Sequence, residues 1–155
     1  MSEGRRPSVS LRQIKDYQFS IDFGAGIPPL LADESAPLGS GAGPSPVQLL
    51  LAAVANCMSD SLYFAMRKFH QDPKGIQTNA TASVGRNEKG RLRIQEITVN
   101  IGFEAKAEEI EHLDRILSQF EDFCTVGQSV RAGIATTVIV SDGTGKELHK
   151  TSGKA

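Results

Sequence analysis

The chain has 155 residues, of which 39% are hydrophobic and 23% charged, and its formal net charge is −1. These values indicate a globular protein of one domain, and they exclude a bulk attraction to nucleic acid or to an anionic membrane. The opening stretch MSEGRRPSVS lacks the apolar run of a signal peptide, and the longest apolar stretch, LLLAAVA, is too short to span a bilayer. We therefore expect a cytoplasmic protein with no nucleic-acid or membrane partner.

The first third of the chain predicts strands followed by a loop. Residues 8–14 and 17–23 alternate apolar and polar side chains, which is typical of a β-hairpin, and residues 29–34 predict a third strand. Residues 35–46 are dense in Gly, Pro and Ser and predict a loop. Its GSGAGP stretch has Pro44 where a dinucleotide-binding loop needs its third glycine, so no nicotinamide cofactor is expected.

A long helix is predicted next. Ser45 and Pro46 form a good start, because the hydroxyl can cap the helix and proline needs no amide partner in the first turn. The apolar residues then follow the helical period to about His70. In the first half the other faces are apolar too, at Leu49, Ala52, Ala53 and Ala55. A helix that is apolar all round is expected to be buried all round.

The remaining elements complete an α+β pattern. Residues 76–86 and 91–103 predict a second hairpin, with its turn at 87–90. An amphipathic helix is expected at 107–122, a shorter helix at 125–132 and a buried strand at 134–140. The order is βββ-α-ββ-αα-β. We expect a single domain over residues 1–141 and a flexible C-terminal tail over 142–155.

The two cysteines, Cys57 and Cys124, lie far apart in the sequence and lack the paired CxxC spacing of a zinc site. The three histidines form no metal-ligand pattern with them and are explained as surface residues, so no metal is expected. The cysteines are therefore either small buried residues or a redox pair that folding brings together, and both interpretations are open.

The neighbours of each cysteine suggest how a thiolate could form. Cys57 lies inside the long helix, where a sheltered thiol is a poor nucleophile unless a cation or donor stabilises its charged form. Ser61, one helical turn later, could donate a hydrogen bond, and arginine would be the best cation. Cys124 directly precedes the predicted short helix, whose positive end favours a thiolate, whereas Glu121 and Asp122 oppose it.

The stretch GPSPVQLLLAAVANCMSDSL, followed later by FEDFCTVGQSVRAGI, resembles the OsmC/Ohr family of osmotically inducible and organic hydroperoxide resistance proteins. The resemblance covers residues 10–141. It implies an OsmC-like fold in which antiparallel-rich sheets wrap around a central buried helix, in an intertwined homodimer.

The resemblance also implies a stress-response peroxidase. Cys57 would attack an organic hydroperoxide and become a sulfenic acid, and Cys124 would condense with it to a disulfide. A dithiol reductant, such as a lipoyl group, would reopen the bridge, and no metal, flavin or nicotinamide would be needed. An apolar pocket around Cys57 would suit a bulky organic hydroperoxide better than hydrogen peroxide.

The sequence departs from the family pattern in one place. Catalytic members carry a glutamate just after the helix-opening proline, paired with an arginine, but here Val47 and Gln48 follow Pro46. Gln48 can hydrogen-bond but cannot form an ion pair. The candidate replacements, each of which could equally be a solvated charge, are Arg12 reaching a partner subunit, then Arg86, and Glu34 as the carboxylate.

This departure keeps two other interpretations open. The first is a non-catalytic OsmC-like protein that binds an apolar small molecule. The second is a domain whose cysteines are only structural.

Overall fold

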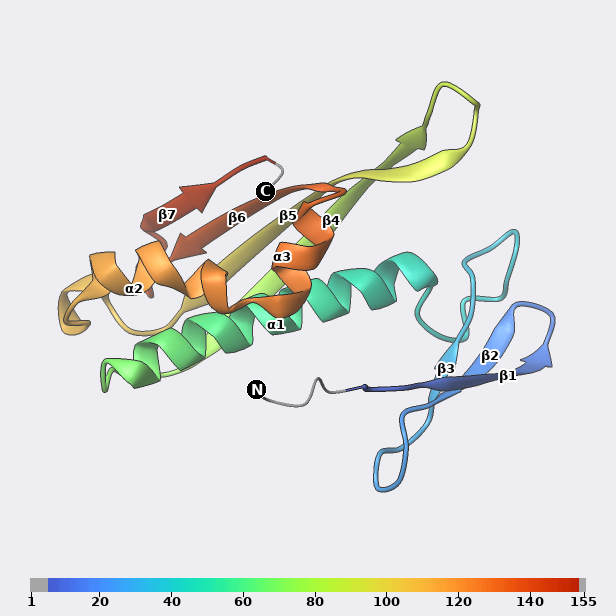
Figure 1. The fold of residues 1–155 in the computed structure, drawn as a ribbon, viewed down its shortest axis with the longest axis horizontal. Coiled ribbons are helices and arrows are strands. Elements are labelled where there is room, and N and C mark those ends of the chain that lie inside the picture. Colours follow the sequence, from blue (N-terminus) through green and yellow to red (C-terminus); the bar gives the residue numbers. More distant parts are fainter. Residues whose placement is uncertain (1–5, 154–155) are drawn as a thin grey trace. The chain divides into compact units, whose positions relative to one another are not determined.

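The computed structural model describes residues 6–153. Its contacts divide the chain into two compact units, with the boundary between Leu49 and Leu50. The first unit holds β1 (Ser10–Lys15), β2 (Gln18–Asp22) and β3 (Leu30–Ala32), which form an antiparallel three-stranded sheet in the order β1-β2-β3 (Figure 1). The hairpin and the third strand predicted from the sequence are thereby confirmed.

The glycine-rich loop after β3 closes around a buried carboxylate. Asp33 is 2% exposed, and its oxygens accept hydrogen bonds from the amides of Glu34, Ser40 and Ala42 and from the Ser40 hydroxyl, at 2.7–3.1 Å. These donors hold the pKa of Asp33 well below its usual range. A Cβ on Gly39 would collide with the Glu34 carbonyl and the Asp33 carboxylate, so the loop requires glycine there. The glycine pattern therefore serves the loop's own packing.

Helix α1 (Pro46–Lys68) begins where the sequence predicts. The Ser45 amide donates to Gln48 Oε1 at 2.9 Å, and the Gln48 amide donates to Ser45 Oγ at 3.3 Å. This reciprocal pair is a capping box, which satisfies two donors that the first helical turn leaves free. The Gln48 side chain is thus engaged in starting the helix.

The second unit contains a four-stranded sheet in the order β4-β5-β6-β7, as Figure 1 shows. Its strands are β4 (Ile76–Arg86), β5 (Leu92–Phe103), β6 (Ala135–Ser141) and β7 (Glu147–Thr151). Strands β5 and β6 are parallel, whereas the outer pairs are antiparallel. Parallel neighbours need a crossover, and helices α2 (Leu113–Gln119) and α3 (Thr125–Arg131) lie in that connection.

The core lies between α1 and this sheet. On α1 the fully buried residues recur at helical spacing, and on β5 and β6 every second residue is buried. The largest fully buried apolar side chains of these three elements are Val54, Met58, Leu62, Met66, Ile97, Val99, Ile101, Val138 and Val140. Phe120, from the helical connection, is also fully buried and belongs to the same cluster.

The expectation that α1 is buried all round is wrong for the single chain. Ala52 and Ala53 are exposed, and Tyr63 and Phe64 are 49% and 55% exposed. The physical reason is that one sheet covers one side of a helix. By length and composition α1 could also cross a membrane, but the core helix of a soluble protein passes the same test, and one face of α1 packs in the core.

The predicted helix at 107–122 is shorter than expected. Residues Ala107–Glu109 form a 3-10 turn, α2 covers only Leu113–Gln119, and a second 3-10 turn, η2, spans Phe120–Phe123. His112 has a φ of 58°, and a left-handed residue cannot continue a right-handed helix. The apolar face was predicted correctly nonetheless, because Ile110, Ile116, Leu117 and Phe120 are all buried.

The expected flexible tail at 142–155 is wrong for its central part, because residues 147–151 form β7 and pair with β6. A turn joins the two strands, in which the Asp142 carboxylate accepts the amides of Thr144 and Lys146. These donors and the Thr144 hydroxyl lower the pKa of Asp142 to about 2. The strand ELHKT has only five residues, and so short an alternation of polar and apolar side chains does not distinguish a strand from a frayed chain end.

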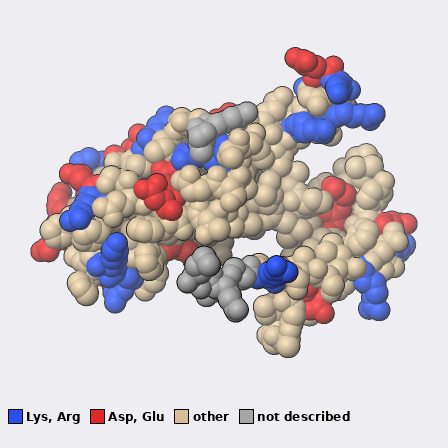
Figure 2. Space-filling model, in the orientation of Figure 1, with Lys and Arg blue, Asp and Glu red and all other residues tan. Residues whose placement is uncertain are grey.

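Charged side chains of both signs are mixed over the face of the molecule seen in Figure 2. Positive groups gather at the tip of the β4–β5 hairpin, where the chain carries Arg86, Lys89, Arg91 and Arg93. Arg86 Nη1 donates to the Gly90 carbonyl at 2.7 Å, which ties the guanidinium to its own turn.

Candidate active site

The folding of the second unit brings the two cysteines together. Cys57 lies in the middle of α1 and is half-buried, whereas Cys124 is the residue before α3 and is 1% exposed. The Val126 amide donates to Cys57 Sγ at 3.5 Å, and the next amide, that of Gly127, donates to Cys124 Sγ at 3.2 Å. The first turn of α3 has amides without helical partners, and here they meet the two sulfurs.

Burial outweighs hydrogen bonding at Cys124. Burial and, second to it, the neighbouring Cys57 thiol raise the pKa of the Cys124 thiol to about 11. The Gly127 amide and the Ser61 hydroxyl act in the opposite direction. The helix-end amide of Gly127 thus favours a Cys124 thiolate as expected, but burial outweighs it, and Cys124 is a neutral thiol at pH 7.

Ser61 lies at this site but does not act as expected. Its hydroxyl donates to the Cys57 backbone carbonyl at 2.7 Å, as serine commonly does to the residue four positions earlier in a helix. Its side chain is buried and also reaches the Cys124 thiol. Ser61 therefore contacts both cysteine residues, at the backbone of one and the sulfur of the other.

Cys57 opens onto an aromatic cleft, and although the resemblance implied an apolar pocket at this cysteine, the two phenylalanines that line it were not predicted. The cleft has a volume of about 370 Å³ and is lined by Cys57, Asp60, Ser61, Phe64 and Phe123. The rings of Phe64 and Phe123 meet edge to face with their centroids 5.2 Å apart. Lys68 Nζ lies 5.4 Å from the Phe123 centroid, on α1 one turn beyond Phe64. Phe123 adjoins Cys124 and Phe64 lies on α1, so the two walls come from the same two segments as the thiols.

A larger cleft, of about 550 Å³, lies between α1 and β4 and is lined by Asn56, Ser59, Asp60, Tyr63 and Thr78 among others. Neither cysteine lines it. Because it holds no thiol or other activated nucleophile, we place the candidate chemistry in the smaller aromatic cleft instead.

The other predicted site residues are described within their own units. Arg12 is exposed on β1, opposite Ser20, and Glu34 is half-buried in the loop after β3. Arg86 bonds to its own hairpin turn, and Gln48 belongs to the capping box of α1. The roles proposed for Arg12 and Glu34 stay predictions. Among residues 6–153 no group of three or more metal-ligating side chains is present.

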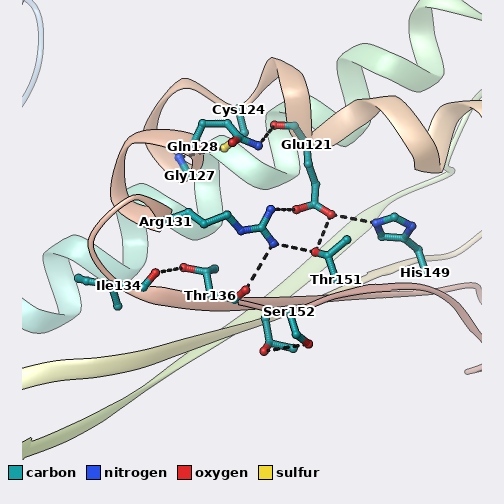
Figure 3. Close-up of polar contacts among 11 residues, drawn as sticks. Glu121, Cys124, Gly127, Gln128, Arg131, Ile134, Thr136, His149, Thr151 and Ser152 are labelled. Carbon is teal, nitrogen blue, oxygen red and sulfur yellow. Dashed lines mark hydrogen bonds and ion pairs between the residues drawn. The ribbon is translucent and has the colours of Figure 1, made fainter. Parts of the chain in front are cut away.

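Beside Cys124 lies a buried charged cluster, shown in Figure 3. Glu121 forms an ion pair with Arg131 and a hydrogen bond with His149, each at 2.9 Å. The sequence interpretation set Glu121 against a Cys124 thiolate and treated His149 as a surface residue. The interpretation of His149 is wrong, because its side chain is only 19% exposed. The effect of Glu121 on Cys124 stays a prediction, although its carboxylate faces Arg131. The pairing joins β7 to the helical connection, which no local sequence pattern reveals.

Comparison with known proteins identifies the family. Residues 39–139 match the family model described as OsmC-like protein. No curated protein matches this chain.

Several solved structures share the fold. An OsmC-like protein of unknown function from Vibrio cholerae has a TM-score of 0.72 at 17% identity, over 88% of this chain and 100% of that one. An organic hydroperoxide resistance protein from Elizabethkingia anophelis, with thiocyanate bound, has a TM-score of 0.69 at 16% identity, over 92% and 99%.

A second Vibrio cholerae protein, provisionally assigned to organic hydroperoxide resistance, has captopril bound in one of its active sites. Its TM-score is 0.67 at 19% identity, over 96% of this chain and 99% of that one. The family model covers well over half of the chain, and the mixed α+β fold with two sheets and three helices agrees with it. This chain belongs to the OsmC-like protein family.

Proposed function

We propose that this protein is a thiol peroxidase that reduces organic hydroperoxides, with Cys57 as the attacking residue and Cys124 as the resolving residue. The observation that carries the proposal is the meeting of the two free thiols beside the Phe64–Phe123 cleft. Hydroperoxide resistance proteins among the structural relatives support a peroxide-related role.

The assignment of roles follows from exposure and charge. Cys57 lines the open cleft, so a substrate can reach its sulfur, whereas Cys124 is buried behind it. At neutral pH Cys124 keeps its proton, which suits a resolving residue that reacts only after the Cys57 sulfur has become a sulfenic acid. The aromatic walls would favour a substrate with an apolar organic group over hydrogen peroxide.

The proposed cycle has three balanced steps. The Cys57 thiolate attacks the terminal oxygen of the hydroperoxide, the O–O bond breaks, and the alkoxide takes a proton and leaves as an alcohol. Cys124 then attacks the sulfenic sulfur, and water leaves as the disulfide forms. A dithiol reductant, such as a lipoyl group, restores both thiols and is itself oxidised to a disulfide.

The activating charge is proposed to come from a second copy of the chain. We expect a homodimer in which Arg12 of the partner subunit approaches Cys57, with Glu34 as the supporting carboxylate. The protein would act in the cytoplasm as part of a stress response.

The test measures consumption of cumene hydroperoxide with dihydrolipoamide as the reductant. We expect turnover by the wild type and only the uncatalysed rate for Cys57→Ser. Cys124→Ser should still form one sulfenic acid per chain, which dimedone would trap, but it should turn over slowly. Equal rates for the wild type and Cys57→Ser would defeat the proposal.

The second candidate is a non-catalytic protein that binds an apolar small molecule. The observation that favours it is Gln48, which stands where catalytic relatives carry a carboxylate and whose amide is engaged in the capping box. This candidate predicts that Cys57 reacts with peroxide no faster than a free thiol, while fatty acids raise the melting temperature. Mass spectrometry after mild peroxide treatment discriminates further, since an absent Cys57–Cys124 bridge would indicate purely structural cysteines.

A further inference from the structure

The charged cluster beside Cys124 is built from three separate elements (Figure 3). Glu121 lies in η2, Arg131 is the last residue of α3, and His149 lies in β7. Their side chains are 10%, 12% and 19% exposed. The exposed Lys74–Glu109 pair is a useful contrast, with 55% and 44% of its side chains accessible.

Most polar atoms of the cluster have hydrogen-bond partners, but the buried Arg131 Nε and Glu121 Oε2 have none among the described residues, and Oε2 is balanced by charge alone. Glu121 Oε1 accepts from the Thr151 hydroxyl at 2.7 Å and from His149 Nε2 at 2.9 Å, while Oε2 faces Arg131 Nη1 at 2.9 Å. Arg131 Nη2 donates to Thr151 Oγ1 at 2.8 Å. Burying a charge is costly unless such partners are in place. These contacts therefore favour one arrangement of η2, α3 and β7.

That arrangement fixes the segment that carries Cys124. The Glu121 carbonyl accepts the Cys124 amide and the Gln128 side-chain amide, both at 3.0 Å. Glu121 therefore precedes Cys124 by one turn, and Arg131 closes the helix that Cys124 caps. One carboxylate–guanidinium pair thus joins the two ends of the segment, and His149 and Thr151 attach that pair to the edge of the sheet.

We propose that Glu121, Arg131 and His149 are positioning residues that set the approach of Cys124 to Cys57 and thereby favour closure of the disulfide. This role rests on the proposed function. In the step concerned, the Cys124 thiol gives up its proton, its sulfur is oxidised as it bonds to the sulfenic sulfur, and that sulfur is reduced as its bond to oxygen breaks and water leaves. The three residues touch neither sulfur in this step.

The experiment measures the equilibrium between the Cys57–Cys124 disulfide and dithiothreitol, which needs no peroxide. Arg131→Met should lower the equilibrium constant for disulfide formation by about tenfold, or about 30 mV for this two-electron couple. Arg131→Lys should recover part of the loss, because it keeps the charge that faces Glu121. His149→Gln, which retains a side-chain donor, should show a smaller shift and serves if Arg131→Met does not fold.

Two controls separate positioning from general stability. Lys74→Met removes the exposed ion pair, and Ile101→Val loosens the core at β5, which carries no cysteine and no member of the charged cluster. Both variants should leave the reduction potential of the Cys57–Cys124 disulfide unchanged, even though Ile101→Val lowers the melting temperature. The proposal is overturned if the reduction potential of the Cys57–Cys124 disulfide is the same in Arg131→Met and His149→Gln as in Ile101→Val.

A second readout follows the first step of the cycle. With cumene hydroperoxide, Arg131→Met should form the dimedone-trapped sulfenic acid at the wild-type rate but close the disulfide more slowly. If the ratio of trapped sulfenic acid to disulfide is the same in Arg131→Met and the wild type, the positioning role is also overturned. A wild type that is inert towards hydroperoxide would overturn the proposed function instead, while the dithiothreitol equilibrium would still decide the role of the cluster.

Discussion

Cys124 shows how burial and hydrogen bonding compete at one side chain. Burial and the adjacent Cys57 raise the pKa of its thiol from 9.0 to about 11, against the Gly127 amide. The unfolded chain therefore loses this proton at a lower pH than the folded chain does. The contribution of Cys124 to stability is complete below about pH 9 and is lost as the pH rises towards 11.

Replacing Cys124 with alanine should remove this alkaline sensitivity. Between pH 9 and 11 the free energy of unfolding of the wild type should fall more steeply than that of Cys124→Ala. The measurement is urea unfolding at several pH values under a phosphine reductant, which keeps both thiols reduced. Parallel curves would mean that burial does not hold the proton on Cys124.

Gly127 leaves room for the side chains of Met58 and Cys124. A Cβ at this position would meet Met58 Cε and lie 2.7 Å from Cys124 Sγ. Because Met58 is fully buried and Cys124 nearly so, neither neighbour can move away freely.

Gly127→Ala should therefore lower the free energy of unfolding by about 1–3 kcal/mol and slow closure of the Cys57–Cys124 disulfide. Gly133→Ala is the matched control, since its Cβ would come no closer than 3.9 Å to the Val130 carbonyl. It should change stability by at most about 1 kcal/mol. Urea unfolding and the rate of disulfide closure check both variants, and equal effects would contradict the packing argument.

At the scale of elements, β7 links the end of the chain to the cysteine segment. It pairs with β6 and supplies His149 and Thr151 to the Glu121 carboxylate. Truncation after Lys146 would expose the edge of β6 and remove two of the partners of a buried carboxylate.

This truncation should cost about 3 kcal/mol or more in the free energy of unfolding. Lys150→Ala, which changes an exposed β7 side chain and leaves the pairing intact, should have little effect. Circular dichroism during urea unfolding provides the measurement. A truncated chain as stable as the full one would restore the interpretation of residues 142–155 as a tail.

Elements with strong local signals were predicted closely, and the others were not. The start of α1 follows from Ser45 and Pro46, and the β4–β5 hairpin follows from alternation and its turn. The broken helix around His112 was missed, because periodicity marks the apolar face but not the backbone angle of one residue. The loop at 35–46 was predicted, but the role of Asp33 in holding it was missed, since the amides that bond to its carboxylate follow no regular sequence pattern.

At the scale of the whole molecule, one side of α1 carries exposed apolar residues. This side includes Ala52, Ala53, Tyr63 and Phe64. The sequence alone predicts that the helix is buried on all sides. An exposed apolar surface of this kind favours association. The homodimer that the resemblance implies would cover it.

We expect a mass near twice 16.6 kDa in light scattering after gel filtration. Ala53→Arg, which places a charge on the exposed side of α1, should shift the equilibrium towards the monomer, whereas Arg67→Ala at an exposed polar position should not. A wild-type monomer at micromolar concentration would contradict the dimer and the role given to Arg12.

The sequence by itself determined the order of the elements as far as β6, the capped start of α1 and the position of Cys124 directly before a short helix. Each depends on interactions over a few residues, which periodicity and capping patterns record. Only the tertiary structure decided that Cys124 keeps its proton, that Phe64 and Phe123 wall a cleft, and that Glu121 pairs with Arg131 and His149. These features depend on burial and on contacts between distant segments, which form only once the chain has closed the loops between them.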